Sequence, residues 1–465
     1  MNVDTLGREN LRQVSHLHRD SVRGWSTSTS WLWSPTSAAA LVIGVVTLVL
    51  RLSYGAARPT DLPGARDVLG SGHFDVTRGS PPAPGSWLYV AAGHAVHVVT
   101  GLSPVHSLVL LAAVASAGAA ALTCVAGTIL GGRWVGIAAG GIVASAPVAW
   151  FAGSTVSPYS VDAFLAALLV VLARRARPDR AHGLIAVGAL GLGAGVRLSV
   201  VPEFCLLAVI AVVASTRTVG QLLAVVVTAV GSVAVWFVPV AVVQRGGLHA
   251  WVHAVHVQLS QVAHASSVFV APASGALTNI GTFGGWTIVT LGPVLVVSVV
   301  AVVVLAVARV ATRQPSGNVS LRIWGAPTES GDRGGRPWYQ GTGAILLAAL
   351  VPPVAVVTLG QFAAGGAVLS YLVPATVLLL LPVARLLHHR ARALRRMAAI
   401  GATLLVTGIV AVNVQRFVAA PGIVPASVTR HHRSLWISQL RYQSPYADTA
   451  DTIRAADGGG GLQRP

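Results

Sequence analysis

The sequence predicts an all-α membrane protein whose helices cross the bilayer many times. Of its 465 residues, 54% are hydrophobic and only 10% are charged, and the mean hydropathy is +0.70, far above the range of soluble globular domains. Apolar stretches near the length that a spanning helix needs recur along the chain. They are uniformly apolar (AALVIGVVTLVL, VVSVVAVVVLAVA), whereas strands of a membrane β-barrel alternate apolar and polar residues. A polytopic helical bundle is therefore expected.

The elements follow from the order of polar and apolar segments. Residues 1–35 are polar, carry four arginines and lack the apolar core and cleavage site of a signal peptide, so we expect a cytoplasmic tail. The first span covers 38–52, and a long polar loop follows at 54–86. Further spans are predicted at 111–129, 135–151, 162–172, 183–196, 200–214, 222–243, 286–308, 344–359, 369–387 and 398–414, about eleven in all.

The charges predict the orientation of this membrane unit, which covers 36–417. All 32 basic residues are arginines, against 14 acidic residues. A nucleic-acid-binding protein would gather such charge on one polar face, but here it is scattered among short connections. With the N-terminus inside, the tail and the cytoplasmic connections hold 20 of the arginines, as the positive-inside rule requires. An odd number of spans then places the tail 418–465 outside, and we expect a multi-pass protein of the plasma membrane.

Cysteine chemistry is not expected to contribute. The chain has two cysteines, Cys124 and Cys205, and both lie inside apolar runs. In that setting they act as small hydrophobic side chains, so neither a disulfide nor a thiolate metal site is implied.

The outer side, on this topology, collects most of the unusual polar residues. Asp61, Asp67 and Asp75 lie in the first outer loop, and Arg197 and Glu203 flank a tight turn between two spans. A charge at the edge of the membrane is costly unless it is paired or lines a wet cavity. An enzyme at this surface would need a carboxylate base. The alternatives are that the loop aspartates favour turns and that Arg197 pairs with Glu203 to hold two helix ends.

The outer segment 246–282 contains a histidine pattern with two interpretations. His249, His253 and His256 are spaced by four and three residues, so on a helix they share one face. Histidines at such spacing can ligate zinc. The interleaved apolar residues, including Trp251, favour instead an amphipathic helix that lies on the membrane surface, and no metal site is predicted.

Several motifs, taken in order, resemble one family. The most specific is HFDVTRGSPPAPGSWLYV at 73–90, and it is followed by SPYSVDAFLAALLVVLARR, GLGAGVRLSVVPEF, GGLHAWVHAVHVQ and GQFAAGGAVLSYLVPATVLLLLP. These segments resemble the GT-C membrane glycosyltransferases, which are related to protein mannosyltransferases and lipid A aminoarabinose transferases. The resemblance spans most of the membrane region and implies a GT-C-like fold.

The resemblance also implies a reaction. The donor would be a sugar on a polyprenyl phosphate, and the acceptor, a glycan, lipid or protein, would be met at the outer face. The catalytic acid of the family is an aspartate of the first outer loop upstream of the FD pair, which leaves Asp67 and Asp61 as the candidates. No nucleotide or other cofactor is implied, and the need for a metal stays open.

The remaining site predictions follow from position. Arg197 is expected to hold the donor phosphate, because a guanidinium stays charged and offers a planar fork of donors. The further residues expected to line the substrate cavity are Asp75, Asp162, Glu203, His253, Gln258 and Tyr371.

Two other classes of function stay open. A transporter or lipid flippase also needs many spans and a few buried charges, and it would show paired broken helices at mid-membrane depth. A GT-C-like scaffold without activity would bind a lipid-linked sugar or a partner. The placement of acids in a long outer loop favours chemistry at the membrane surface.

Overall fold

The structure is a computed structural model, which describes residues 35–266 except 179, 273–311, 337–361, 365–387 and 392–419. The tails 1–34 and 420–465 lie outside the described residues. The α-helices are α2 (Pro35–Ser53), α3 (Leu62–Gly72), α4 (Trp87–Thr100), α5 (Pro104–Gly131), α6 (Arg133–Ser145), α7 (Pro147–Gly153), α8 (Tyr159–Arg175), α9 (His182–Val196), α10 (Val200–Ser215), α11 (Val219–Val243), α12 (Gly247–Ser266), α13 (Ala273–Ala311), α14 (Thr342–Ala355), α15 (Leu369–Leu387) and α16 (Arg392–Ala419). Four short helical turns complete them: η1 (Val76–Arg78), η2 (Trp338–Gln340), η3 (Val356–Gln361) and η4 (Gly365–Val368).

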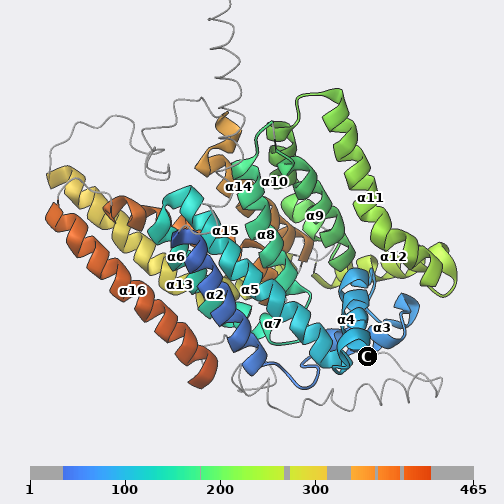
Figure 1. Ribbon diagram of the computed structural model, residues 1–465. Coiled ribbons are helices and arrows are strands. Elements are labelled where there is room, and N and C mark those ends of the chain that lie inside the picture. The colour runs from blue at the N-terminus through green and yellow to red at the C-terminus, as the bar shows by residue number, and fades with distance from the viewer. Residues whose placement is uncertain are drawn as a thin grey trace, which may run out of the picture.

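The predicted all-α, polytopic architecture is confirmed for the described residues (Figure 1). Within the described ranges, seven helices are long and apolar enough to cross a membrane, and α6 with α7 makes an eighth if that bent pair is one span. The other three predicted spans correspond to α8, α9 and α10, which have 17, 15 and 16 residues. At 1.5 Å per residue these helices fall just short of the ~20 residues of a full crossing. The count of about eleven spans therefore stays a prediction.

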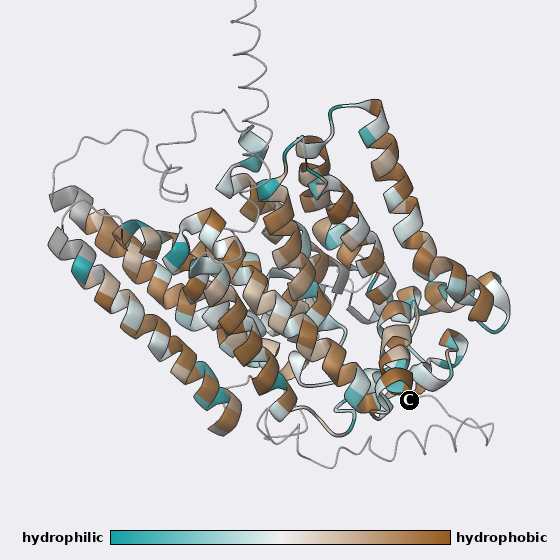
Figure 2. Ribbon diagram, in the orientation of Figure 1, coloured by the Kyte–Doolittle hydropathy of each residue, from teal (hydrophilic) through white to brown (hydrophobic). Residues whose placement is uncertain are grey.

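The core lies around α5, α8 and α15, which pack against one another. In the most apolar window of each helix, 78% of α15 and 61% of α5 are buried, against 17% of α2, α11 and α16. The last three helices therefore form the border of the bundle, with α16 and α11 on opposite sides (Figure 1). Their exposed valines and leucines give that border its apolar colour in Figure 2, as expected for a surface against lipid.

Small residues let the central helices approach closely. A Cβ atom on Gly127 of α5 would lie 2.8 Å from the Cα atom of Gly136 on α6. The two helices touch backbone to backbone at this point, which only glycine allows. The glycine-rich pieces of the sequence thus serve helix packing.

Three helices gather at one end of the bundle. They are formed by the first outer loop, by the residues directly after it, and by the outer segment. The loop predicted at 54–86 is not simply polar coil, because it contains α3 and η1 and leads directly into α4. The segment after α11 forms α12, as the amphipathic pattern predicts. In Figure 1, α3, α4 and α12 lie together at the lower right. We call this the loop end of the bundle.

The break between α6 and α7 bends the chain by 61°. Pro147 opens α7, so α6 ends without a continuous hydrogen-bond ladder across the break. Arg51 of α2, which is fully buried, donates from Nη2 to the freed carbonyl of Ala144 at 2.6 Å and from Nε to Ser116 Oγ at 3.2 Å. A cation at a helix C-terminus also stabilises the helix dipole. Arg51 therefore holds the bent span to α2 and α5.

Candidate active site

Two carboxylates of the first outer loop belong to the beginning of α3. Asp61 precedes the helix directly, and Asp67 lies within it, six residues further along the chain. Asp61 is the N-cap of α3, and its side chain accepts a hydrogen bond from the Gly64 N–H at 2.7 Å. A proline at the first turn of α3 suits this start, since its missing N–H would have no partner in the helix. Asp67 points inward and is only 3% exposed, and its Oδ1 has no hydrogen-bond partner. The loop therefore holds one accessible carboxylate and one buried one.

The two carboxylates differ in their electrostatics. Burial raises the pKa of Asp67 well above its usual range, and the nearby charge of Asp61 raises it further. Asp61 is exposed along one side, yet desolvation by the surrounding protein also raises its pKa, partly offset by the Gly64 N–H. Desolvation is the largest cause of the shift for both carboxyls, and the upward shift is stronger for Asp67, whose side chain is buried.

Tyr89 of α4 connects these acids to the rest of the bundle. Its hydroxyl donates to the Leu108 carbonyl of α5 at 2.9 Å and accepts from the Ser157 N–H at 3.1 Å. Its ring belongs to an apolar group that we call the Tyr89 cluster, made of Tyr89, Leu108, Val109 and Val156 with Val68, Val105, Leu111 and Val196 packed against it. This cluster fixes α3 against the segment that leads into α8.

Asp162 and Arg197 form a buried ion pair between α8 and the C-terminal end of α9. Arg197 Nη1 contacts Asp162 Oδ2, and the Asp162 side chain is fully buried. The guanidinium also lies over the ring of Tyr159, 3.9 Å from the ring centre, a favourable cation–π geometry. The sequence left open a pairing of Arg197 with Glu203, but the ion pair that Arg197 forms is with Asp162.

Glu203 and Tyr371 lie deeper in the bundle. Glu203, at the start of α10, is 1% exposed and within electrostatic reach of Arg197. The Tyr371 hydroxyl on α15 shares a 2.8 Å hydrogen bond with Thr287 of α13, and its ring packs in the main core. Glu203 is thus the one of the two for which an interaction with the ion pair is recorded among the described residues.

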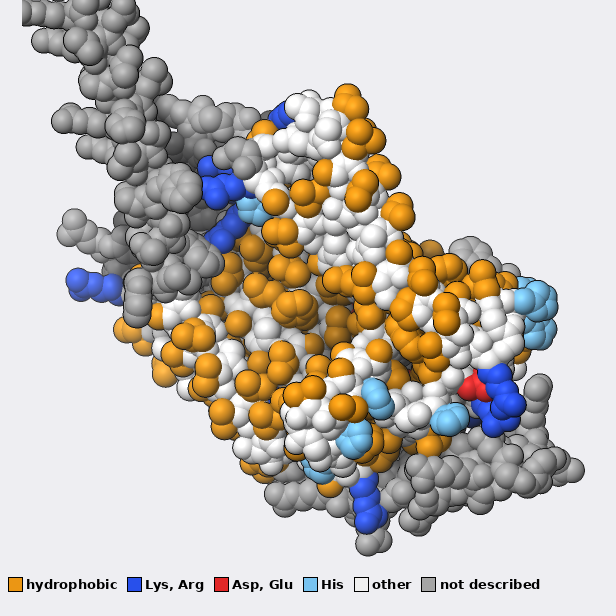
Figure 3. Space-filling view, turned by 45° about the vertical axis from the view of Figure 1, so that its right-hand side comes forward, with side chains coloured by type: hydrophobic (Ala, Val, Ile, Leu, Met, Phe, Trp, Pro, Cys, Tyr) orange, Lys and Arg blue, Asp and Glu red, His pale blue; other side chains and the backbone are white. Residues whose placement is uncertain are grey.

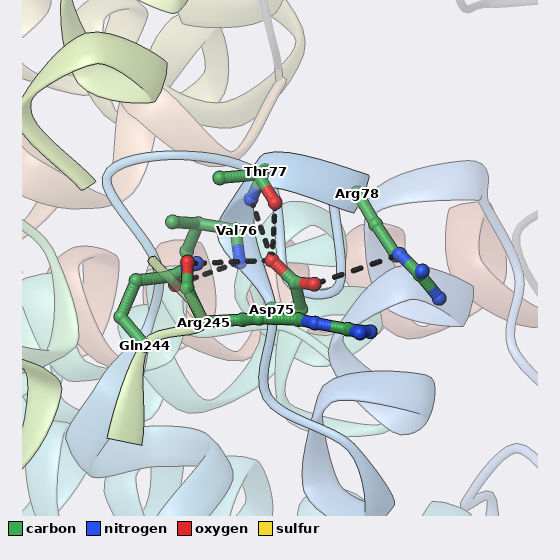
Figure 4. A network of polar contacts seen from close by, with 6 residues as sticks. All are labelled: Asp75, Val76, Thr77, Arg78, Gln244 and Arg245. Carbon is green, nitrogen blue, oxygen red and sulfur yellow. Dashed lines mark hydrogen bonds and ion pairs between the residues drawn. The ribbon is translucent and has the colours of Figure 1, made fainter. Parts of the chain in front are cut away.

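Asp75 links the first outer loop to the end of α11 (Figure 4). It caps η1 by accepting from the Thr77 N–H at 3.1 Å, and it accepts from Gln244 Nε2 at 3.0 Å. Gln244 Oε1 in turn accepts from the Val76 N–H at 3.1 Å. Burial raises the pKa of Asp75, but the hydrogen bonds from Thr77 and Gln244 and the charge of Arg78 outweigh it, so the pKa is lowered. Asp75 is therefore an ionised structural anchor.

The helix α12 docks on the same loop through Trp251. The Trp251 Nε1 donates to the Pro84 carbonyl at 2.9 Å, and the indole packs edge-on against Phe237 of α11. Val76, Ala194, Trp236, Val240 and Trp251 form the buried centre of this contact, which we call the Trp251 cluster. Gln258 is half-buried, whereas His249, His253 and His256 are exposed. His253 therefore lies on the exposed side of α12.

The end of α9 joins these pieces into one site. Val196 packs against the Tyr89 cluster, while Ala194 and Leu198 belong to or pack against the Trp251 cluster. Arg197 therefore follows a segment that contacts both the Tyr89 cluster, which includes Val68 of α3, and the Trp251 cluster. The described contacts join Asp162 to Arg197 and place Asp61 and Asp67 within electrostatic reach of each other, while Asp75 anchors η1.

Three residues of this region have no role in the sequence-based prediction. Arg51 holds the bent span, Tyr89 joins four segments, and Gln244 clamps η1. Arg51 had a signal, because it lies at the end of the first span where the positive-inside rule disfavours arginine. Tyr89 and Gln244 had none, since their partners are backbone groups or residues far along the chain.

Comparison with known proteins finds similarity only at the level of structure. No protein-family model matches the sequence, and no curated protein matches it. Among solved structures, ArnT from Cupriavidus metallidurans bound to undecaprenyl phosphate is 13% identical, with a TM-score of 0.38 over 93% of this chain and 79% of that one. ArnT from the same organism in the apo state is 13% identical, with a TM-score of 0.42 over 92% and 80% of the two chains.

Proposed function

We propose that this protein is a GT-C-type membrane glycosyltransferase that transfers a sugar from a polyprenyl-phosphate donor to an acceptor at the outer face of the plasma membrane. The observation that carries the proposal is the pairing of an exposed carboxylate, Asp61, with a buried one, Asp67, at the start of α3. The Asp162–Arg197 ion pair supplies a cation elsewhere in the same unit. The GT-C-like motifs of the sequence support the same chemistry. A group that accepts a proton and a cation that meets a phosphate are what such a transfer needs.

Asp61 is the better candidate for the general base. A base must be ionised at working pH and must reach the acceptor hydroxyl. Asp61 is exposed, whereas Asp67 is buried and holds its proton more tightly. In the proposed step the acceptor oxygen attacks the anomeric carbon, its proton passes to Asp61, and the bond from that carbon to the phosphate oxygen breaks. The sugar is transferred with inversion.

Arg197 is the residue that we propose to meet the leaving phosphate. Asp162 and the Tyr159 ring orient its guanidinium, and a guanidinium has five N–H donors, more than one carboxylate uses. The phosphate gains negative charge as it leaves, so this contact strengthens in the transition state. Asp162 in this proposal positions Arg197 and does not touch the substrate.

The test uses the full chain in lipid nanodiscs with a panel of undecaprenyl-phosphate sugars and an envelope extract as the source of acceptors. Release of undecaprenyl phosphate is followed by mass spectrometry. We expect the wild-type protein to consume at least one donor, and Asp61→Asn to slow this by about 10²- to 10⁴-fold.

Asp67→Asn is the matched control, because it makes the same change six residues away in the same helix, and it should keep most of the activity. Folding of each variant is checked by thermal unfolding. Full activity in folded Asp61→Asn rejects Asp61 as the base, and the absence of any donor consumption by folded wild type rejects the proposed function.

A further inference from the structure

At the end of the bundle opposite to the Asp61 site, the structure contains a pocket that the proposed function does not use. It has a cavity volume of about 280 Å³ and lies among the ends of α9, α10 and α11. Its polar lining includes Arg180, Ser215, Thr216 and Gln221, and its apolar lining includes Leu184 and Val225. The opposite location follows from α8, which begins beside Asp162 and ends at Arg174 and Arg175.

The one charged residue that lines this pocket is Arg180. The stretch 174–180 contains four arginines and one aspartate, and Arg217 directly follows the lining residue Thr216 in sequence. Arg180 and Arg217 are exposed. Figure 3 shows basic side chains on the upper part of the molecule and others at its lower edge. The arginine bias assigns this end to the cytoplasmic side.

The pocket also adjoins a surface built for hydrocarbon. Ala224 and Val225 of α11 form part of its wall, and Leu222, Leu223, Val226 and Val227 of the same helix are 49–70% exposed. A ligand with a headgroup between α9 and α11 could therefore lay an acyl chain along α11. A free anion would use the polar lining and leave the apolar wall unused.

Backbone donors add to this arrangement. The helix α9 begins at the pocket, and its N-cap, Ala181, offers no side-chain oxygen to the first N–H groups. Such N–H groups favour a negative charge. The start of α11 is different, because Thr218 and Gln221 form a capping box there.

From the cavity, the lining guanidinium of Arg180 and the apolar wall together, we propose that this pocket binds the phosphate headgroup of an anionic phospholipid of the cytoplasmic leaflet. Basic pockets between membrane helices on that side suit such headgroups. The site is independent of the proposed glycosyl transfer and stands whether or not that reaction occurs.

The experiment measures thermal unfolding of the full chain in detergent with added phosphatidylglycerol, phosphatidylcholine or inorganic phosphate, and lipid retention by native mass spectrometry. We expect phosphatidylglycerol alone to raise the unfolding temperature and to be retained. Arg180→Gln should weaken phosphatidylglycerol binding about fivefold, since one arginine near an anionic lipid surface is worth about 1 kcal/mol.

Two further variants distinguish lipid binding in the pocket from a general attraction of anionic lipid to positive charge. Ala224→Leu fills the cavity without changing charge and should also reduce retention. Arg133→Gln removes an exposed arginine that does not line the pocket and should leave binding unchanged. The proposal is overturned if Arg180→Gln and Ala224→Leu bind like wild type, if Arg133→Gln weakens binding equally, or if inorganic phosphate gives the same stabilisation as phosphatidylglycerol.

Discussion

At the scale of single residues, burial distinguishes Asp61, the N-cap of α3, from Asp67 inside the helix, although both are aspartates. Asp67 has a raised pKa because its carboxyl is buried and faces the charge of Asp61. A raised pKa in the folded protein means that ionisation opposes folding. The stability of the wild-type protein is therefore full below the ordinary aspartate pKa of about 3.9 and falls as the pH rises through the folded pKa.

Asp67→Asn should remove this dependence, because asparagine has the same shape and no charge. We expect the variant and the wild type to unfold at similar temperatures near about pH 4 and the variant to be more stable at neutral pH, by about 1.4 kcal/mol for each unit of the shift. Thermal unfolding measured across this pH range checks it. A difference that stays constant with pH would show that Asp67 does not carry the shifted pKa.

The Asp162–Arg197 pair makes a second prediction at this scale. Asp162→Asn leaves a buried guanidinium without its counter-ion and should cost about 3–5 kcal/mol of stability, and replacing both partners in Asp162→Asn/Arg197→Met should recover much of it. Arg197→Lys keeps the charge but loses the fork and the contact with Tyr159. That variant should therefore lose transfer activity while unfolding near the wild-type temperature. Near-normal kinetics would leave Arg197 as a structural residue.

Sequence reasoning found both charged members of this pair but not the pairing. Arg197 and Asp162 stood out because charges at the ends of spans are costly. Their contact crosses 35 residues and depends on how α8 and α9 pack. Glu203 is nearer in sequence and equally buried, yet the ion pair forms with Asp162. Spacing alone does not contain that information.

At the scale of elements, the outer loop is held by side chains from the far end of α11. Gln244 both donates to Asp75 and accepts from the Val76 N–H. Gln244→Glu would put a second carboxylate against Asp75 and remove the donor. We expect faster proteolysis within 54–86 and lower stability at neutral pH, with recovery on acidification as the carboxylates take up protons.

The matched control lies at the other end of the same helix. Gln221→Glu keeps the capping box with Thr218, and an acid in the first turn favours the helix dipole. Its digestion pattern should resemble that of the wild type. Equal protection of the loop in Gln244→Glu would show that the Asp75 contact does not anchor it.

The elements also show where hydropathy is an incomplete guide. The helix α12 was predicted because its amphipathic pattern is strong. The loop 54–86 read as polar coil, since its glycines, prolines and aspartates resemble turn signals. Those residues instead begin and end short helices, with Asp61 and Asp75 as N-caps. Caps and turns use the same residue types, so tertiary contacts decide between them.

At the scale of the whole molecule, the arginine distribution predicts the N-terminus inside and the C-terminus outside. An alkaline phosphatase fusion after Pro465 should be active, and a fluorescent protein inserted in the 174–180 connection should fold in the cytoplasm. Cytoplasmic activity of a fusion after Pro465 would overturn the odd number of spans. It would also exchange the leaflets assigned to the two ends of the bundle.

The uniform hydropathy of the apolar segments predicts an all-α bundle, but it does not fix how many of these segments cross the membrane. Each predicted span contains a helix, but α8, α9 and α10 are short and partly surrounded by protein. A helix shielded by its neighbours can be shorter than the hydrocarbon because loops and side chains of the bundle complete its path. The lengths of the apolar segments therefore give a range for the number of spans. The packing of the helices decides which of these segments cross the membrane.

Arg51 has a consequence for biosynthesis. Its partners Ser116 and Ala144 follow it by 65 and 93 residues, so at a synthesis rate of about 5–20 residues per second the ribosome needs about 5–20 s to make Ala144 after Arg51. During that interval the nascent first helix carries an arginine with no partner, and its long side chain can keep the guanidinium hydrated at the membrane surface. The helix can seat fully only when α5 and α6 have been inserted beside it. The first membrane helix to be synthesised is thus among the last to reach its final depth in the bilayer.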